Sequence, residues 1–284
     1  MCNEWTGCYT SGNKAGKSLL RSPERGKEEM IANLETGTRV DEVAAGIYRI
    51  CTPLDVIPGG FTVNSYLIDD DEPLLFHAGY RKLFSNTLEA VQKVMPVERL
   101  RWIGGSHFEG DEYGALNEFL AVAPKATPFG AEIGVLTSIN DYAIRDARGL
   151  GDGEEFSIGG RRMKWMYTPH VPHGWDCGVL FDVSTGTLLC GDLFTQPGSG
   201  MAPVTETEVL SASETMRGMM DYYAHATRTT AILGRLAKLH PSMLACQHGS
   251  AYRGDGATLL RELAITIEKE SGKLSEETQA LITQ

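Results

Sequence analysis

The sequence predicts an α/β fold in which two β-sheets pack face to face and helices cover their outer surfaces. Segments rich in β-branched and aromatic residues fall into two groups, one in each half of the chain, and each group is accompanied by segments of helical periodicity. Histidines and acidic residues follow directly after several of the expected strands, which is where open α/β folds place their functional groups.

Short runs of β-branched and aromatic residues predict the strands of the first half, at 47–50, 61–68, 74–77 and 101–104. The spacing of apolar residues predicts two helices among them, at 81–94 and 112–122. Each of these helices stops just before a proline, Pro96 or Pro124, and a proline cannot continue a helix. A polar loop separates the last strand from the second helix.

The second half repeats this organisation, with expected strands at 162–167, 179–183, 187–190 and 243–246. The Ser184-Thr185-Gly186 tripeptide lies between the second and third of these strands and predicts a hairpin turn. Residues 206–239 are expected to be largely helical, and a further helix is expected from residue 257 to 269 and beyond.

The length of 284 residues is enough to bury a large core, and residues 39–284 are expected to form a single domain. Residues 1–38 mix Gly, Ser, Lys, Arg and Glu without an apolar period. Such a composition does not bury enough surface to order itself, so we expect a disordered extension there.

Composition and charge narrow the class of protein. The net charge of −11 argues against binding to nucleic acid or to an anionic membrane surface, because both require basic patches. The chain shows neither a long apolar run nor the layout of a signal peptide, so we expect a cytoplasmic protein without a membrane span. The six cysteines form no CxxC pair and are expected to be reduced thiols, mostly in the core.

Six side chains of metal-ligating type form the most informative pattern. The segment 107–111 reads HxExD and places three donors on alternate positions of one loop, which share a face if the loop is extended. The other three donors each follow a separate expected strand. Imidazoles and carboxylates are the usual ligands of divalent first-row metals, and six of them are enough for two ions with a shared bridge. The candidate ligands are His107, Glu109, Asp111, His173, Asp192 and His248.

This ordered set resembles the metallo-β-lactamase superfamily, specifically its flavodiiron branch and the oxygen-binding diiron proteins within it. The spacing between His173 and Asp192 fits the pattern of that branch, whereas the spacing from His170 is too long. The resemblance extends from about residue 40 to 270 and includes residues 64–68, which are similar to one of the opening strands of the superfamily.

The resemblance implies an αββα sandwich with a binuclear site at one edge. It also implies that one iron is held by His107, Glu109 and His173, the other by Asp111 and His248, with Asp192 as the bridge. The zinc hydrolases of the superfamily resemble HxHxDH, with an imidazole where this chain has Glu109. Because a third carboxylate makes the site harder and lowers the cost of reaching two ferric ions, we expect two iron ions, with two zinc ions as the alternative.

Three features depart from the pattern of the family. Glu112 stands where the family usually has a histidine, so the second metal is expected either to lack a ligand or to take Glu112 instead. His77 replaces an aspartate that is common at a strand end near the start of the superfamily. We interpret His77, His170 and Glu112 as candidates to lie around the ligands, with the two histidines as candidate proton relays. Too few residues follow His248 for a flavodoxin domain, so no FMN is expected in this chain.

The leading functional hypothesis is a non-haem diiron protein that binds, and by extension reduces, dioxygen or nitric oxide. Sustained reduction would need an external electron donor. One alternative is a binuclear hydrolase, in which a metal-bridging hydroxide attacks an ester, thioester, lactam or phosphodiester. Another is an oxygen-sensing interaction module whose contact with a partner protein changes on oxygenation. Because related diiron proteins pair head to tail, the resemblance also implies a homodimer.

Overall fold

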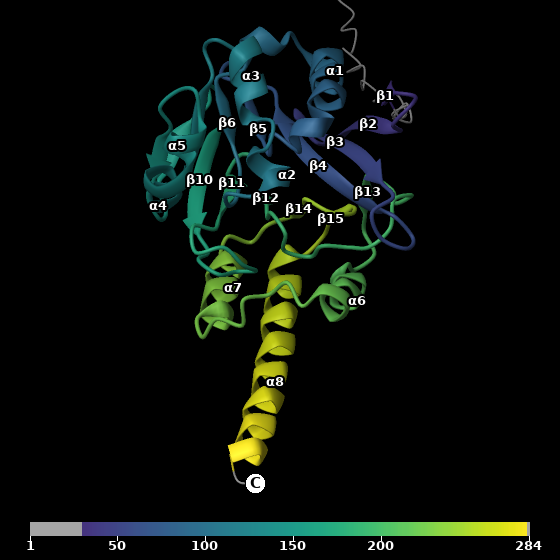
Figure 1. Ribbon diagram of the computed structural model, residues 1–284, viewed down its shortest axis with the longest axis vertical. Helices are drawn as coiled ribbons and strands as arrows, with labels where there is room; N and C mark the ends of the chain where they lie inside the picture. The colour runs from purple at the N-terminus through teal and green to yellow at the C-terminus, as the bar shows by residue number, and fades with distance from the viewer. Residues whose placement is uncertain (1–29, 283–284) are drawn as a thin grey trace, which may run out of the picture.

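The structure, a computed structural model, describes residues 30–282 and contains two β-sheets (Figure 1). The strands of the first sheet lie side by side in sequence order from β1 to β8. They pair antiparallel from β1 to β5 and parallel from β5 to β8. These strands are Met30–Asn33 (β1), Thr38–Ala44 (β2), Ile47–Leu54 (β3), Phe61–Ile68 (β4), Leu74–Phe76 (β5), Trp102–Gly104 (β6), Thr127–Ala131 (β7) and Arg148–Leu150 (β8).

The second sheet has the strand order β13-β15-β14-β12-β11-β10-β9. Strands β10, β12 and β14 run in the same direction, because β11 is antiparallel to both β10 and β12 and β12 is parallel to β14. The carboxyl ends of these three strands therefore meet at one edge of the sheet. The strands are Glu155–Ser157 (β9), Arg162–Tyr167 (β10), Gly178–Asp182 (β11), Thr187–Leu189 (β12), Val204–Thr205 (β13), Met243–Ala245 (β14) and Ala251–Arg253 (β15).

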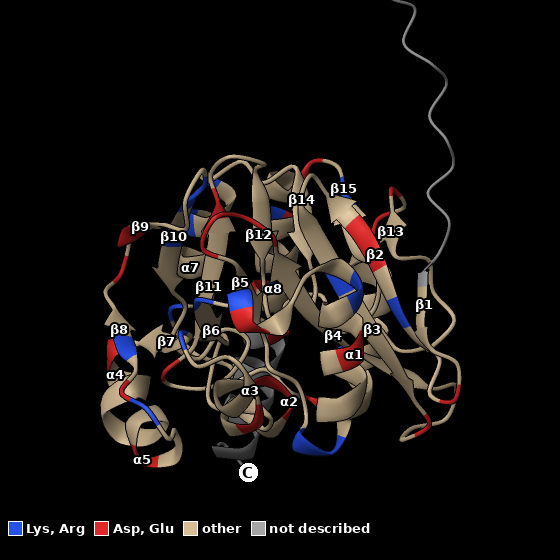
Figure 2. Cartoon of the chain, turned by 90° about the horizontal axis from the view of Figure 1, so that it is seen from above, with Lys and Arg blue, Asp and Glu red and all other residues tan. Residues whose placement is uncertain are grey.

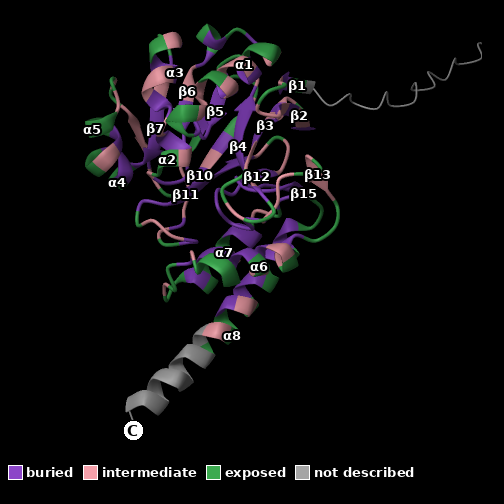
Figure 3. Cartoon of the chain, turned by 45° about the vertical axis from the view of Figure 1, so that its right-hand side comes forward, coloured by how far each residue is buried: buried purple, intermediate pink, exposed green. Residues whose placement is uncertain are grey.

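A shared apolar core holds the two sheets together. Phe76 and Phe129 of the first sheet belong to the same buried cluster as Trp165 and Leu189 of the second. The rings of Phe129 and Trp165 meet edge to face, with centroids 6.2 Å apart. Figure 3 shows the buried residues concentrated on the strands and on the helix faces that meet them.

Helices cover the outer face of each sheet. A second buried cluster joins α1 and α3 to the first sheet, and a third joins α7 and α8 to the second sheet. This αββα arrangement confirms the predicted fold class. The helices are Phe84–Val94 (α1), Gly110–Tyr113 (α2), Leu116–Val122 (α3), Glu132–Gly134 (α4), Asn140–Tyr142 (α5), Leu210–Met220 (α6), Thr229–Ala237 (α7) and Gly256–Ile282 (α8), with short 3₁₀ or π turns at Arg81–Leu83, Val97–Arg99 and Val135–Ile139.

The folded part of the chain begins earlier than we expected. Strand β1 pairs with β2, and the Asn33 side chain donates a 2.9 Å hydrogen bond to Glu89 of α1. The disordered extension predicted over residues 1–38 is therefore too long, because a four-residue edge strand carries too little pattern to be recognised. The rest of that prediction, over residues 1–29, lies outside the described residues.

The predicted helical segment 206–239 is interrupted. Helix α6 ends at Met220, the next residue Asp221 takes a left-handed conformation with φ 46°, and α7 begins only at Thr229. The hairpin prediction is confirmed, because Gly186 has φ 68° and its N–H donates to the carbonyl of Asp182 between β11 and β12.

Figure 2 shows Lys and Arg interspersed with Asp and Glu over the strands and helices in view. Within residues 30–282, no helix is both long and apolar enough to cross a bilayer.

Candidate metal centre

The loops after β6, β10, β12 and β14 carry all six candidate ligands. The loop after β6 leads into α2 and belongs to the first sheet, whereas the other three follow the co-directional strands of the second sheet. The site therefore lies where loops from both sheets converge. In chain order the ligands are His107, Glu109 and Asp111 after β6, His173 after β10, Asp192 after β12 and His248 after β14.

Four of these side chains form a first group. The Nε2 atoms of His107 and His173 are 3.0 Å apart, and Glu109 Oε1 lies 3.3 Å from each of them. Asp192 Oδ2 is 3.3 Å from His173 Nε2 and 3.7 Å from His107 Nε2. One ligand atom from each of the four lies within 4.8 Å of all the others, which is an arrangement that could hold one metal ion.

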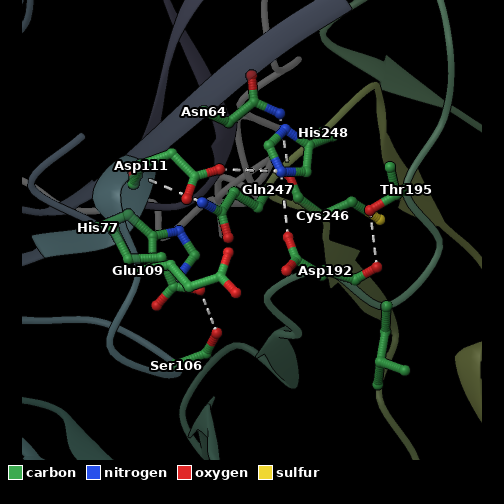
Figure 4. Close-up of polar contacts among 12 residues, drawn as sticks. Asn64, His77, Ser106, Glu109, Asp111, Asp192, Thr195, Cys246, Gln247 and His248 are labelled. Atoms are coloured by element: carbon green, nitrogen blue, oxygen red, sulfur yellow. Dashed lines mark hydrogen bonds and ion pairs between the residues drawn. The ribbon is translucent and has the colours of Figure 1, made fainter. Parts of the chain in front are cut away.

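The other two candidates form a second group around the same aspartate. His248 Nε2 is 3.4 Å from Asp111 Oδ2 and 3.1 Å from Asp192 Oδ1 (Figure 4). Asp192 thus directs one carboxylate oxygen to each group. Its Oδ1 atom is buried and its partner is the imidazole of His248, so a bound cation would lie between these two groups.

Hydrogen bonds on the far side of two imidazoles fix their orientation. His248 Nδ1 lies 2.7 Å from the carbonyl oxygen of Thr62, and since a carbonyl only accepts, Nδ1 carries the proton. This leaves the Nε2 lone pair of a neutral His248 for a metal. The ring also stacks on Phe61 with centroids 4.4 Å apart.

Glu112 performs the same role for the first group. Its Oε1 atom lies 2.9 Å from His107 Nδ1 and accepts a 2.5 Å hydrogen bond from Ser106, while its Oε2 atom accepts the His107 backbone N–H at 2.9 Å. The fully buried Glu112 therefore lies behind His107 and does not face the second group. The structure gives no support to the alternative in which Glu112 supplies the missing ligand of the second metal, because both of its oxygens are engaged with Ser106 and His107.

The pKa values show how the site balances its charge without a metal. Burial alone would lower the pKa of His248, but Asp111 and Asp192 outweigh it and raise this pKa to about 10. Hydrogen bonds from His107 and His173 lower the pKa of Glu109 to about 2. Burial opposes ionisation of Asp192, yet His248 and the other histidines hold the pKa of this carboxyl below its usual value. Protonated imidazoles thus stand in for positive charge that bound cations would supply.

His77 follows β5 and is fully buried with φ 68°, and its Nε2 atom lies 3.6 Å from Glu112 Oε2. Burial lowers its pKa in spite of the Glu112 charge. The structure thus places His77 behind Glu112, while its role as a proton relay stays a prediction. The side chain of His170 is exposed and lies outside the lining of the pocket beside the ligands, so the structure gives no support to a relay there.

A pocket of about 510 Å³ opens beside the ligands. The exposed fractions of Glu109 and His173 are 48% and 24%, so the first group borders solvent, while Asp192 is buried. Besides the ligands, the lining consists mainly of apolar and aromatic side chains, among them Val56, Ile57, Phe61, Tyr80, Met216, Met220 and Tyr222.

Sequence reasoning missed several residues that support the ligands. Thr62 acts through its backbone carbonyl, which any residue type supplies, so no sequence signal identifies it. Ser106 stands directly before His107 and donates a hydrogen bond to Glu112. Its position in the polar loop was the only feature of the sequence that could have indicated this role. Tyr80 lies in a loop outside the ligand motifs, so the sequence did not indicate it. Burial is the main cause that raises its pKa to about 12, and the charges of nearby acidic residues add to it.

A protein-family model described as "ODP family beta lactamase" matches residues 61–249. The matched segment covers more than half of the chain and contains every candidate ligand. The chain belongs to this family. The predicted resemblance to the flavodiiron branch of the metallo-β-lactamase superfamily is thereby confirmed.

Curated relatives of this family member include a protein named rubredoxin-oxygen oxidoreductase from Megalodesulfovibrio gigas, 23% identical over 206 residues, which are 69% of this chain and 50% of the relative. A protein named putative diflavin flavoprotein A 1 from Nostoc sp. is 27% identical over 138 residues, or 48% of this chain and 24% of the relative. The chain therefore spans half or less of the length of these relatives.

Solved structures support the fold. The fragment 1–254 of putative diflavin flavoprotein A 5 from Nostoc sp. superposes with a TM-score of 0.71 and 19% identity, covering 89% of this chain and 100% of the fragment. Rubredoxin oxygen:oxidoreductase from Desulfovibrio gigas superposes with a TM-score of 0.68 and 20% identity, covering 80% of this chain and 61% of the other.

Proposed function

We propose that this chain is a non-haem diiron protein that binds dioxygen or nitric oxide between its two groups of ligands. The observation that carries the proposal is Asp192, whose two carboxylate oxygens point to two separate groups of donor atoms. The names of the relatives support an oxygen-related activity, since one of them is called an oxygen oxidoreductase.

The donor chemistry fits iron. His107, Glu109 and His173 would hold one ion, Asp111 and His248 the other, and Asp192 would lie between them. Neutral imidazoles mixed with carboxylates suit iron, which such sites bind in both of its common oxidation states. Bound iron would supply the electrons for activating dioxygen.

The chain's own residues prepare the site for a small apolar ligand. The pocket is lined by Val56, Ile57 and Met216, among other residues. Water binds weakly to such apolar side chains, which favours entry of an uncharged gas. Because its pKa is raised to about 12, Tyr80 keeps its hydroxyl proton at neutral pH and can donate a hydrogen bond into the pocket. Glu112 holds the His107 ring from behind and increases its basicity as a ligand.

Three finer points stay predictions: the supply of electrons by an external donor, reduction beyond binding, and a homodimer. An oxygen-sensing role also stays a prediction, because a sensor and an oxygen-binding protein would bind the gas at the same site by the same chemistry.

The experiment is anaerobic reconstitution with ferrous iron, followed by elemental analysis and ultraviolet–visible spectra before and after oxygen is admitted. We expect two iron ions per chain and new absorption in the visible range on oxygenation. Protein loaded with zinc is the control and should stay colourless. A protein that retains only zinc, shows no change with oxygen and hydrolyses generic esters or phosphodiesters without oxygen would instead be a hydrolase.

A further inference from the structure

Two cysteines that take no part in the ligand set lie directly behind it. Cys190 and Cys246 stand two residues before Asp192 and His248, just past the ends of β12 and β14. The parallel register of these strands makes the two cysteines direct neighbours across the sheet. Their sulfur atoms are 3.9 Å apart, and both residues are 0% exposed.

The backbone geometry permits a bond between these sulfurs. Neighbouring strands are separated by about 4.8 Å, and disulfides join residues whose Cα atoms are about 4.4–6.8 Å apart. The sulfurs, 3.9 Å apart, must approach to about 2.0 Å for a bond to form. They lie in the buried cluster that packs against α7 and α8, so a dissolved oxidant or thiol does not reach them in the folded protein.

The ligand site offers the route to an oxidant that the solvent does not. Gly191 separates Cys190 from the bridging aspartate, and Gln247 separates Cys246 from His248. A 3.0 Å hydrogen bond from the Gln247 N–H to the Gly191 carbonyl links the two connections. Electrons leaving the sulfurs therefore have a short path through bonds to the ligands of both groups.

We propose that Cys190 and Cys246 are an internal electron source that forms a disulfide when dioxygen is reduced at the neighbouring site. The inference rests on the proposed function, since it takes bound dioxygen as the oxidant. Two S–H bonds break and one S–S bond forms, which releases two electrons and two protons. Together with one electron from each of two ferrous ions and two protons from solvent, these reduce one dioxygen fully to two waters.

The test counts thiols and peroxide in the full-length protein. Anaerobic diferrous protein receives one equivalent of dioxygen, is denatured in an alkylating reagent, and is digested without reductant for mass spectrometry. We expect a Cys190–Cys246 linked peptide, a loss of two free thiols and little hydrogen peroxide. In Cys190→Ala and Cys246→Ala, the same iron should release about one peroxide per dioxygen, because the second electron pair is missing.

Cys51→Ala is the matched control, since Cys51 is equally buried but lies on β3 and precedes no ligand. This variant should behave as the parent protein. Thermal unfolding of each variant identifies any that fails to fold. Zinc-loaded parent protein given the same dioxygen tests whether the bond forms without a redox-active metal.

The outcomes separate the two proposals. If iron oxidises while both thiols are still free to react with the alkylating reagent, the electron-source inference is overturned and the diiron site stands. A linked peptide that forms equally in the zinc-loaded protein would also overturn it, because the oxidant would then not be dioxygen reduced at iron. If the protein binds no iron, the proposed function fails and the electron-source inference fails with it, and the elemental analysis distinguishes this case from the previous one.

Discussion

The two groups of ligands differ in donors and in enclosure. The first group gathers two histidines, Glu109 and one oxygen of Asp192, but Glu109 and His173 border solvent. The second group has one histidine, Asp111 and the other oxygen of Asp192, and all three side chains are at most 13% exposed. With an ion in each group, the first position would gain affinity from its larger number of donors, whereas the second would leave more of its ion open to another ligand.

The different neighbours of the two histidines explain part of this asymmetry. Glu112 stands where the family usually places a further histidine, and the structure turns its charge onto the back of His107. His248 is held instead by a neutral backbone carbonyl. Glu112 would therefore strengthen metal binding at the first position and supply no donor to the second.

The largest expected effect comes from the residue that both positions share. Asp192→Asn removes the negative charge between the groups, and we expect iron affinity to fall by more than about 100-fold at both positions. Equilibrium dialysis followed by elemental analysis measures this loss. Asp221→Asn is the control, because Asp221 is exposed and asparagine tolerates its left-handed conformation. Retention of two iron ions in the Asp192 variant would refute the bridging role.

The next substitutions test the two groups separately. His173→Asn should remove the tighter ion, whereas His248→Asn should leave a protein with one iron held by the first group. Metal titration with stoichiometry readout distinguishes these results. His170→Asn, on the same loop as His173 but exposed, serves as the control and should retain both ions. Equal loss of both ions in the two variants would mean that the positions do not differ as the donor count indicates.

Glu112→Gln addresses the contact behind His107. Removing the buried charge should weaken metal binding at the first position by about 10–100-fold and leave the second position nearly unchanged. Competition with a chelator of known affinity gives both constants. Glu118→Gln, a partly exposed glutamate that pairs with Arg81 on the surface, is the matched control. A loss confined to the second position would indicate that Glu112 moves to ligate there once metal is bound.

The convergence of the candidate ligands could be predicted from the sequence, whereas the residues that surround them could not. Glu109 and Asp111 could be recognised because side-chain chemistry and spacing are written in the sequence, and the site brings both into place. The contact between Thr62 and His248 could not be predicted, since it uses a backbone atom 186 positions away. Glu112 was ambiguous because its spacing fits either group, and only packing decides which way its side chain turns.

The fold shows the same division. The eight-residue strand β4 was predicted at its observed bounds, whereas β3, of the same length, was predicted only over residues 47–50. The short strands β7, β8, β9, β13 and β15 were not, because runs of two to five residues carry little periodicity and are defined by their neighbours in the sheet.

The smallest expected effect is a pH dependence of opposite sign in metal-free and metal-bound protein. The pKa of His248 is about 10 in the folded metal-free state against 6.5 for an unperturbed histidine. Its proton therefore stabilises the metal-free fold fully below the unfolded pKa, and this contribution is lost as pH rises through the folded pKa. We expect the free energy of unfolding of the metal-free protein to decrease between about pH 7 and 9 in chemical denaturation.

Metal binding should show the reverse trend over the same range, because the ion must displace the proton from His248 Nε2. Zinc is the suitable probe, since it does not change oxidation state, and calorimetry in buffers of different ionisation enthalpy counts the protons released. His248→Asn should reduce the slope of both profiles without removing it, because the pKa values of His107 and His173 are also raised, and His170→Asn should leave the profiles as in the parent protein. If the free energy of unfolding of the metal-free protein rises with pH, His248 is not protonated between Asp111 and Asp192. This outcome would contradict the charge balance proposed for the second group.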